Sequence, residues 1–173
     1  MSVLPSTVYL VVMGVAGCGK SSLGSALAQA QGLPLIEGDD HHSPVSREKM
    51  RQGIALTDED REGWLATLGQ LLQAHPHGAV LTCSALKKVY RNRLRNACPG
   101  LLFVFLEIDR ASAGQRVAAR AGTHFFSSTL VDSQFATLES PVGEAGVLRL
   151  DALLNLATLQ QQASAWIAAQ ESA

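Results

Sequence analysis

The sequence predicts an α/β fold in which helices cover both faces of a five-stranded parallel sheet. Five short runs are apolar at consecutive positions, which is typical of parallel strands buried on both faces: residues 8–13, 34–37, 79–83, 101–108 and 147–151. Segments with the apolar spacing of helices lie between these runs. Right-handed crossovers between consecutive parallel strands then place the helices on both sides of the sheet, in three layers.

Length and composition indicate one domain, which we expect to comprise residues 1–173. With 47% apolar and only 17% charged residues, the chain can bury a full core, and a disordered chain is excluded. The 14 Lys and Arg nearly balance the 15 Asp and Glu, for a formal net charge of -1. This balance argues against a dedicated nucleic-acid binder.

The cysteines and apolar runs bear on the compartment. Cys18, Cys83 and Cys98 show no spacing typical of a metal site, so reduced thiols in a cytoplasmic protein are the simplest interpretation. The run 8–13 leads into a glycine loop rather than a cleavage site, which argues against a signal peptide. No apolar run approaches the roughly 20 residues of a membrane span, so we expect no membrane partner.

The first predicted strand is followed by a phosphate-binding loop. Residues 14–21 fit the pattern G-x-x-x-x-G-K-[S/T], and the apolar face of a helix follows directly. The glycines let backbone N–H groups turn inward around phosphate oxygens, Lys20 reaches the β- and γ-phosphates, and Ser21 ligates Mg²⁺. The loop predicts nucleotide binding without choosing between a kinase, an NTPase and a nucleotide-gated regulator. Its candidate residues are Gly14, Val15, Ala16, Gly17, Cys18, Gly19, Lys20, Ser21 and Ser22.

Two adjacent carboxylates follow the second predicted strand, in Gly38-Asp39-Asp40-His41-His42. Ligands of open α/β sheets bind beyond the carboxyl ends of the strands, so we expect these side chains near the phosphate loop. One aspartate is suited to orient or deprotonate an acceptor hydroxyl while the other holds the water shell of Mg²⁺, and solvated turn residues are the alternative. The two histidines lack an apparent third ligand for zinc.

The next predicted helix begins with a cap at Thr57 or Asp58. Its core-facing positions recur at helical spacing: Trp64, Leu68, Leu71 and Leu72. The acidic residues 58–60 favour the positive end of the helix dipole, whereas Arg61 does not. Holding an anionic substrate is one explanation for Arg61, and the sequence leaves it open.

Basic side chains follow the third and fourth predicted strands. Lys87, Arg91 and Arg95 share one helical face, which is usually solvated, but Lys87 and Arg91 are also placed to attract an acidic small molecule. Arg116 and Arg120 are four residues apart as well. They are either lid arginines that close over a transferring phosphoryl group or solvated arginines on a surface helix.

The chain ends with the predicted strand 147–151 and one more helix. The apolar positions of that helix are Leu156, Leu159, Ala163, Trp166 and Ile167. The connections 38–53 and 116–146 are long enough to carry function, and both leave from the edge at which the strands end.

Taken together, these segments resemble the gluconate kinase (gluconokinase) family, small P-loop sugar-acid kinases related in fold to shikimate and nucleoside monophosphate kinases. The resemblance extends from the phosphate loop to Pro141, and its most specific motif is Cys83-Ser84-Ala85-Leu86-Lys87-Lys88. The other matching positions are Gly38-Asp39-Asp40 with His42, Lys49-Met50, residues 56–61 with Trp64-Leu65, Tyr90-Arg91, His124-Phe125, Ser133-Gln134-Phe135 and Leu138-Glu139.

The resemblance implies a P-loop kinase fold with a mobile lid at about residues 116–140, in a cytoplasmic homodimer. It also implies phosphorylation of D-gluconate at its 6-hydroxyl by ATP with Mg²⁺. In this interpretation Asp39 orients the acceptor hydroxyl and joins Ser21 at Mg²⁺, Lys20 stabilises the phosphoryl charge, and Arg120 is the lid residue on the phosphates. The implied substrate-binding residues are Asp39, His42, Lys49, Arg61, Lys87 and Arg91.

The chain departs from the family pattern at Ser43, Ser46 and Gly63, and by one extra residue between Arg120 and His124. These differences bear on acceptor preference and lid geometry. A kinase of shikimate or another small hydroxy acid is the nearest alternative function. A nucleotide-binding switch is the other, and it predicts ATP binding without acceptor-dependent turnover.

Overall fold

A parallel five-stranded sheet in the order β2-β3-β1-β4-β5 forms the centre of the computed structural model, which describes residues 7–120 and 128–171. The strands are β1 Val8–Met13, β2 Leu35–Glu37, β3 Gly78–Thr82, β4 Leu102–Glu107 and β5 Val147–Asp151. All five predicted strands are confirmed, with ends that differ by no more than one residue. Strand β3, which lies between β2 and β1, is buried at every position, which explains its apolar run.

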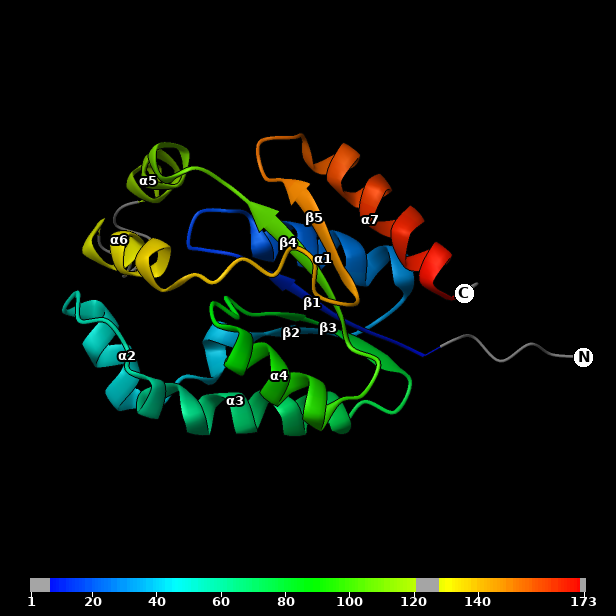
Figure 1. Cartoon of the computed structure of the whole chain (residues 1–173), viewed down its shortest axis with the longest axis horizontal. Coiled ribbons are helices and arrows are strands. Elements are labelled where there is room, and N and C mark those ends of the chain that lie inside the picture. Colours follow the sequence, from blue (N-terminus) through cyan, green and yellow to red (C-terminus); the bar gives the residue numbers. More distant parts are fainter. Residues whose placement is uncertain (1–6, 121–127, 172–173) are drawn as a thin grey trace, which may run out of the picture.

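Helices cover both faces of this sheet, which confirms the three-layer architecture (Figure 1). Helix α1 (Lys20–Gln31) packs beside α7 (Leu156–Glu171) on one face, and α3 (Asp58–Gln73) packs beside α4 (Lys88–Ala97) on the other. The remaining elements are the 3-10 turn η1 (Gly38–His41) and helices α2 (Pro44–Arg51), α5 (Arg110–Ala119) and α6 (Ser128–Thr137). In Figure 1, α2, α5 and α6 lie at the left, beyond the carboxyl ends of the strands.

Local sequence signals fix the elements that carry polar side chains. Thr57 is the N-cap of α3, and its hydroxyl accepts from the Asp60 backbone N–H while the Asp60 carboxylate accepts from the Thr57 N–H. This reciprocal capping box decides the predicted choice between Thr57 and Asp58 in favour of Thr57.

Gly38 allows the turn η1 to lie against β3, because a Cβ at this position would lie 2.2 Å from the Thr82 carbonyl oxygen. Only glycine therefore lets η1 approach β3 this closely.

Part of the predicted lid lies outside the described residues. The range 116–140 includes residues 121–127, so His124 and the extra residue before it have no described position. The described parts of this range are the end of α5 and helix α6.

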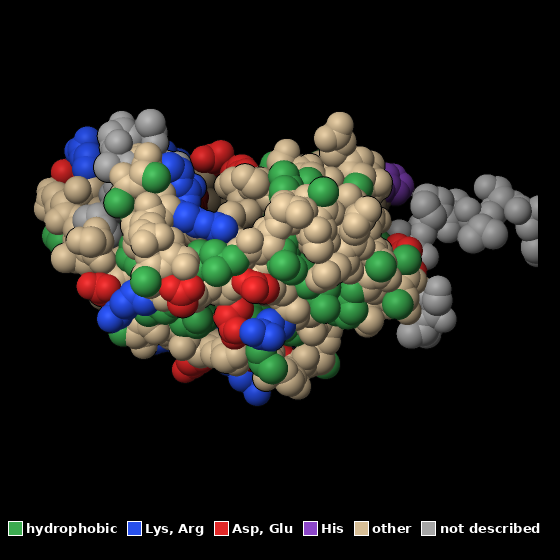
Figure 2. All heavy atoms as spheres, turned by 90° about the horizontal axis from the view of Figure 1, so that it is seen from above, with side chains coloured by type: hydrophobic (Ala, Val, Ile, Leu, Met, Phe, Trp, Pro, Cys, Tyr) green, Lys and Arg blue, Asp and Glu red, His purple; other side chains and the backbone are tan. Residues whose placement is uncertain are grey.

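The surface carries charges of both signs. Figure 2 views the molecule from the side of α5, β5 and α7, and on this face acidic and basic side chains lie beside one another. Within residues 7–120 and 128–171, no helix combines the length and the apolar character needed to cross a membrane. Cys18, Cys83 and Cys98 are free thiols, and all three are buried.

Candidate active site

The phosphate loop joins β1 to α1 and closes tightly on itself. Gly14 has a φ of +148°, and a Cβ there would lie 2.7 Å from the Cys18 Sγ atom. The Lys20 Nζ atom donates to the carbonyl oxygens of Gly14 and Val15 at 3.1 and 3.3 Å, so the ammonium group lies over the loop. The side chains of Val15 and Cys18 are buried in the core, which leaves only their backbone for a phosphate.

A cavity opens at the N-terminus of α1, beside this loop. It is lined by Gly17, Gly19, Lys20, Ser21, Ser22, Asp39 and Arg120. The structure thus brings Asp39 and Arg120 together with the phosphate-loop residues, although they come from η1 and the end of α5. Backbone N–H groups, a helix N-terminus and two cations suit this cavity to a polyphosphate.

Glu37, the last residue of β2, is a candidate metal-site residue that the sequence interpretation missed. Its Oε2 atom accepts from the Ser21 hydroxyl at 3.0 Å and from the Thr82 hydroxyl at 2.7 Å. Hydroxyl and carboxylate oxygens are the ligands that Mg²⁺ prefers, so Ser21 and Glu37 fit this ion when nucleotide phosphates complete its shell. A single acid at the carboxyl end of an apolar strand was the available signal.

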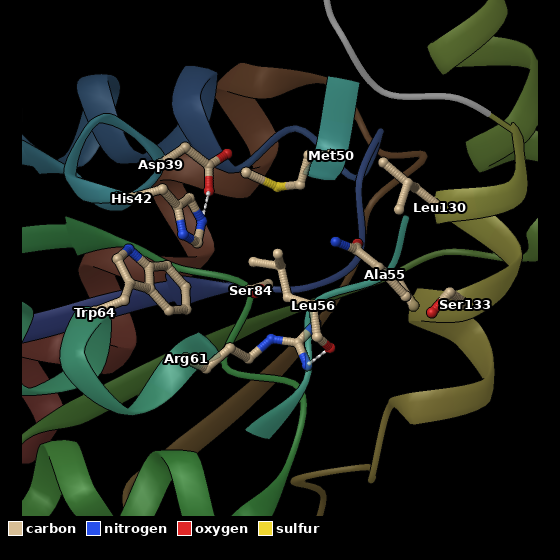
Figure 3. A pocket seen from close by; sticks show the side chains of 11 residues that line it. Asp39, His42, Met50, Ala55, Leu56, Arg61, Trp64, Ser84, Leu130 and Ser133 are labelled. Carbon is tan, nitrogen blue, oxygen red and sulfur yellow. Dashed lines mark hydrogen bonds and ion pairs between the residues drawn. The ribbon is translucent and has the colours of Figure 1, made fainter. Parts of the chain in front are cut away.

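A second cavity lies next to the first and shares Asp39 with it. Its polar lining comprises Asp39, His42, Arg61, Ser84, Ser133 and Gln134, and its apolar lining comprises Met50, Ala55, Leu56, Trp64 and Leu130. Figure 3 shows Asp39 and His42 on one side of this cavity, Arg61 across from them, and Leu130 and Ser133 on α6. We call it the acceptor pocket, because Asp39 faces both it and the phosphate cavity.

His42 and Trp64 hold the turn that presents Asp39. The two rings stack with centroids 4.2 Å apart, and the Trp64 indole N–H donates to the Gly38 carbonyl oxygen at 2.8 Å. The His42 Nε2 atom lies 3.7 Å from the Asp39 Oδ1 atom. The His42 Nδ1 atom is buried and has no hydrogen-bond partner among the described residues, so it is available to a ligand hydroxyl.

Arg61 is a buried cation in the wall of the acceptor pocket. One of its guanidinium nitrogens donates to the Leu56 carbonyl oxygen at 2.9 Å and to the Tyr90 hydroxyl at 3.2 Å. The Leu56 contact is drawn in Figure 3. In the part of the chain that the structure describes, Arg61 forms no ion pair with a carboxylate.

Lys49 and Lys87, both predicted to bind substrate, are paired with acids of the first turn of α3. Lys49 lies 2.9 Å from the Asp60 carboxylate, and Lys87 lies 2.9 Å from that of Asp58. The hydrogen bond from the Thr57 backbone, followed by that from Lys49, lowers the pKa of Asp60 to about 2. The hydrogen bond with Asp58 raises the pKa of Lys87. Neither lysine lines the acceptor pocket.

Arg91, another predicted substrate residue, is enclosed by the protein and does not line the acceptor pocket. Its guanidinium group donates to both carboxylate oxygens of Glu144, at 3.0 and 2.6 Å, and to the Ala85 carbonyl oxygen at 2.8 Å. Arg95 shares Glu144, at 2.9 Å. The predicted solvated stripe is therefore wrong for Arg91, because a carboxylate far along the chain neutralises it inside the structure.

Arg116 on α5 and Arg120 just beyond its end, the two arginines predicted for a lid, have different surroundings. Arg116 donates to the carbonyl oxygens of Gly17 at 3.2 Å and Ala152 at 3.0 Å, so it fastens the outside of the phosphate loop to the β5–α7 connection. Arg120 lines the phosphate cavity. Of the two, only Arg120 is placed among the residues that would surround a nucleotide phosphate.

The departures from the family pattern have local explanations. Ser43 is the N-cap of α2, where its hydroxyl accepts from the Ser46 backbone N–H at 3.0 Å, and Pro44 opens the helix. Gly63 lies on α3, where an added Cβ would meet nothing within 4 Å. None of these residues lines either cavity.

Comparisons with known proteins agree with this geometry. The family model described as shikimate kinase matches residues 16–134. A gluconokinase of Gluconobacter oxydans is 43% identical over 145 residues, 82% of this chain and 81% of the relative. The thermosensitive gluconokinase of Escherichia coli is 38% identical over 156 residues, 88% of this chain and 83% of the relative. The crystal structure of a gluconokinase from Sinorhizobium meliloti is 45% identical, with a TM-score of 0.87 over 94% of this chain and 93% of that one.

Proposed function

The chain belongs to the gluconokinase family, and we propose that it transfers the γ-phosphoryl group of ATP to the 6-hydroxyl of D-gluconate, giving 6-phospho-D-gluconate and ADP. The observation that carries the choice of substrate is the charge of Arg61. A buried cation is strongly disfavoured unless an anion or a good set of hydrogen bonds compensates it. With no carboxylate of the described residues paired to Arg61, a carboxylate of the substrate supplies that partner.

The rest of the pocket suits a polyhydroxy chain. Ser84, Ser133 and the unpartnered Nδ1 atom of His42 offer hydrogen bonds to hydroxyl groups. Asp39 lies where the acceptor pocket meets the phosphate cavity, so the terminal hydroxyl lies there and the carboxylate lies at Arg61.

In the transfer, the 6-oxygen attacks the γ-phosphorus and its proton passes to the Asp39 carboxylate. The bond from the γ-phosphorus to the bridging oxygen of ADP breaks. Lys20 and Arg120 stabilise the charge on the phosphoryl oxygens, and Ser21 and Glu37 would hold a magnesium ion. Bound Mg²⁺ neutralises phosphate charge and orients the nucleotide.

We further propose the lid, the dimer and the compartment that the family resemblance implies. The support for a lid over residues 116–140 is that Arg120 at the end of α5 and Leu130 on α6 line adjoining cavities. The cytoplasmic homodimer rests on the resemblance alone.

The test is acceptor-dependent release of ADP from Mg-ATP, compared for D-gluconate, shikimate and no acceptor. We expect turnover with gluconate on the order of 1 to 100 per second, and identification of the product by NMR as the 6-phosphate. Turnover only with shikimate would show that shikimate, not gluconate, is the acceptor. Release of ADP that does not depend on any acceptor would favour a nucleotide-binding switch.

Two variants assign the roles of Lys20 and Asp39. Asp39→Asn should lower kcat about 100-fold or more, because general base catalysis contributes roughly 10² to 10⁴ in rate. Asp40→Asn is the matched control, since the neighbouring carboxylate is exposed and lines neither cavity. Lys20→Ala should also lower kcat strongly while gluconate affinity is largely kept.

A further inference from the structure

Gln134 joins the acceptor pocket to the phosphate loop. It lies on α6 and lines the acceptor pocket, and its Oε1 atom accepts from the Ala16 backbone N–H at 2.7 Å. The two residues are 118 positions apart in the chain. The reaction proposed above does not use Gln134.

The contact with Ala16 fixes which way the amide faces. A backbone N–H can only donate, so the Gln134 atom that faces the Ala16 N–H is the amide oxygen Oε1. The NH₂ group of Nε2, on the same amide carbon, therefore points away from Ala16. Nε2 has two N–H bonds, and none of the residues in 7–120 and 128–171 accepts from it. Gln134 is half-buried and lines the pocket, so the N–H groups of its amide can meet an acceptor atom of a bound ligand.

The backbone around Gln134 is held at both ends. Asp132 pairs with Arg110 of α5 at 3.3 Å. Beyond the end of α6, the Glu139 backbone N–H donates to the Leu86 carbonyl oxygen at 2.7 Å, and the Glu139 carboxylate accepts from the Lys88 N–H at 2.8 Å. The donor is therefore fixed relative to the β3–α4 connection as well as to the phosphate loop, as a positioned reaction requires.

We propose that the Gln134 amide donates a hydrogen bond to the reacting hydroxyl of the acceptor, on the opposite side from Asp39; this rests on the proposed function. A hydroxyl has one proton and two lone pairs. Asp39 accepts the proton, Gln134 binds one lone pair, and the other is left to form the bond to phosphorus. The Ala16 contact places this donor next to the loop that holds the phosphoryl group.

Two substitutions separate this role from that of a mere clamp on the phosphate loop. Gln134→Glu keeps an oxygen for the Ala16 N–H but removes the NH₂ donor, whereas Gln134→Met removes both at similar size. We expect both variants to lower kcat with gluconate about 10- to 100-fold while KM for ATP changes less than about threefold. The control is Gln160→Glu on α7, whose amide bonds Ser164 far from the pocket.

A binding cycle identifies the contacted atom. The dissociation constants of D-gluconate and 6-deoxy-D-gluconate are measured by calorimetry with ADP present, for the unmodified chain and for Gln134→Met. We expect loss of the 6-hydroxyl to weaken binding about 3- to 10-fold less in the variant, the range for one hydrogen bond. Thermal unfolding of each variant verifies that it is folded.

Each outcome decides a different question. If Gln134→Glu retains full kcat, Gln134 is only a clamp and the inference is overturned. Equal loss of affinity in both proteins, with KM for ATP raised, would place the amide on the nucleotide phosphate and overturn it as well. An unmodified chain that does not phosphorylate gluconate would instead overturn the proposed function.

Discussion

The two buried arginines Arg61 on α3 and Arg91 on α4 differ in the partners of their guanidinium groups. Arg91 is fully enclosed and meets both oxygens of the Glu144 carboxylate. Arg61 is 8% exposed and meets a carbonyl and a hydroxyl, but no carboxylate of the described residues. Burial alone therefore does not identify a binding cation. What distinguishes Arg61 is its place in a pocket wall without a carboxylate of the described residues at ion-pair distance.

The same distinction separates Arg61 from the two lysines near it. Lys49 and Lys87 are each bound by an aspartate of the first turn of α3. These two lysines are therefore neutralised by neighbouring acids, whereas Arg61, in the wall of the acceptor pocket, forms no ion pair with a carboxylate of the described residues.

Arg91→Met should lower the free energy of unfolding by about 3 kcal/mol, because it removes two charge-assisted hydrogen bonds and leaves Glu144 with Arg95 as its remaining cation. Urea denaturation measures this loss. The preference for gluconate over a neutral polyol should remain in the folded variant. A stable Arg91→Met variant that has lost the preference for gluconate would show that Arg91, and not Arg61 alone, binds the substrate carboxylate.

Arg61→Met should weaken the binding of gluconate without lowering the stability of the fold. A charge-assisted hydrogen bond contributes about 1.5 to 3 kcal/mol, so KM for gluconate should rise about 10- to 150-fold. KM for ATP should change less than about threefold, and the urea midpoint should not fall. Steady-state kinetics with each substrate varied separate these effects. Equal increases in both KM values would contradict the assignment.

Asp60→Asn should affect stability in a pH-dependent way. The pKa of Asp60 in the folded chain is about 2, below the ordinary value of 3.8. The contribution of the ionised Asp60 carboxylate to the free energy of unfolding is therefore present above about pH 4 and is lost as the pH falls from about 4 to 2. The variant should be less stable by about 1 kcal/mol at pH 7, as for a lost helix cap, with a smaller difference at pH 2.5.

Urea midpoints at these two pH values measure the effect of Asp60→Asn. A difference that stays constant with pH would show that the carboxylate charge is not what stabilises this turn.

The smallest expected effect is on thiol chemistry. Burial raises the pKa of Cys18 and raises that of Cys83 to about 12, and Cys98 is buried too. A thiolate reagent at pH 7.5 should therefore label none of them within minutes in the folded chain and all three after unfolding. Rapid labelling of Cys83 would show that the wall beside Ser84 opens.

Sequence periodicity could predict the fold because each signal is local. Apolar runs marked the strands, the glycine pattern marked the phosphate loop, and Thr57 was available as a helix cap. For the site, the rule that ligands bind beyond the carboxyl ends of the strands predicted that Asp39 lies near Lys20 and Ser21, and all three line one cavity in the structure.

The sequence could not show which distant residues become the interaction partners of a side chain in the folded structure. Spacing placed Arg91 on a basic helical face, but its partner Glu144 is 53 positions away. The contact between Ala16 and Gln134 joins residues even farther apart. Whether a cation binds a substrate depends on such partners, so it is settled by packing rather than by periodicity.

The central claim is that the charge of Arg61 is kept for the acceptor carboxylate. Its most direct test is the ratio of kcat/KM for D-gluconate to that for D-glucitol, which has a hydroxymethyl group in place of the carboxylate, in the unmodified chain and in Arg61→Met. We expect a preference for gluconate of about 10- to 150-fold that falls to near unity in the variant. A variant that keeps the preference would contradict the claim, because another group would then bind the carboxylate.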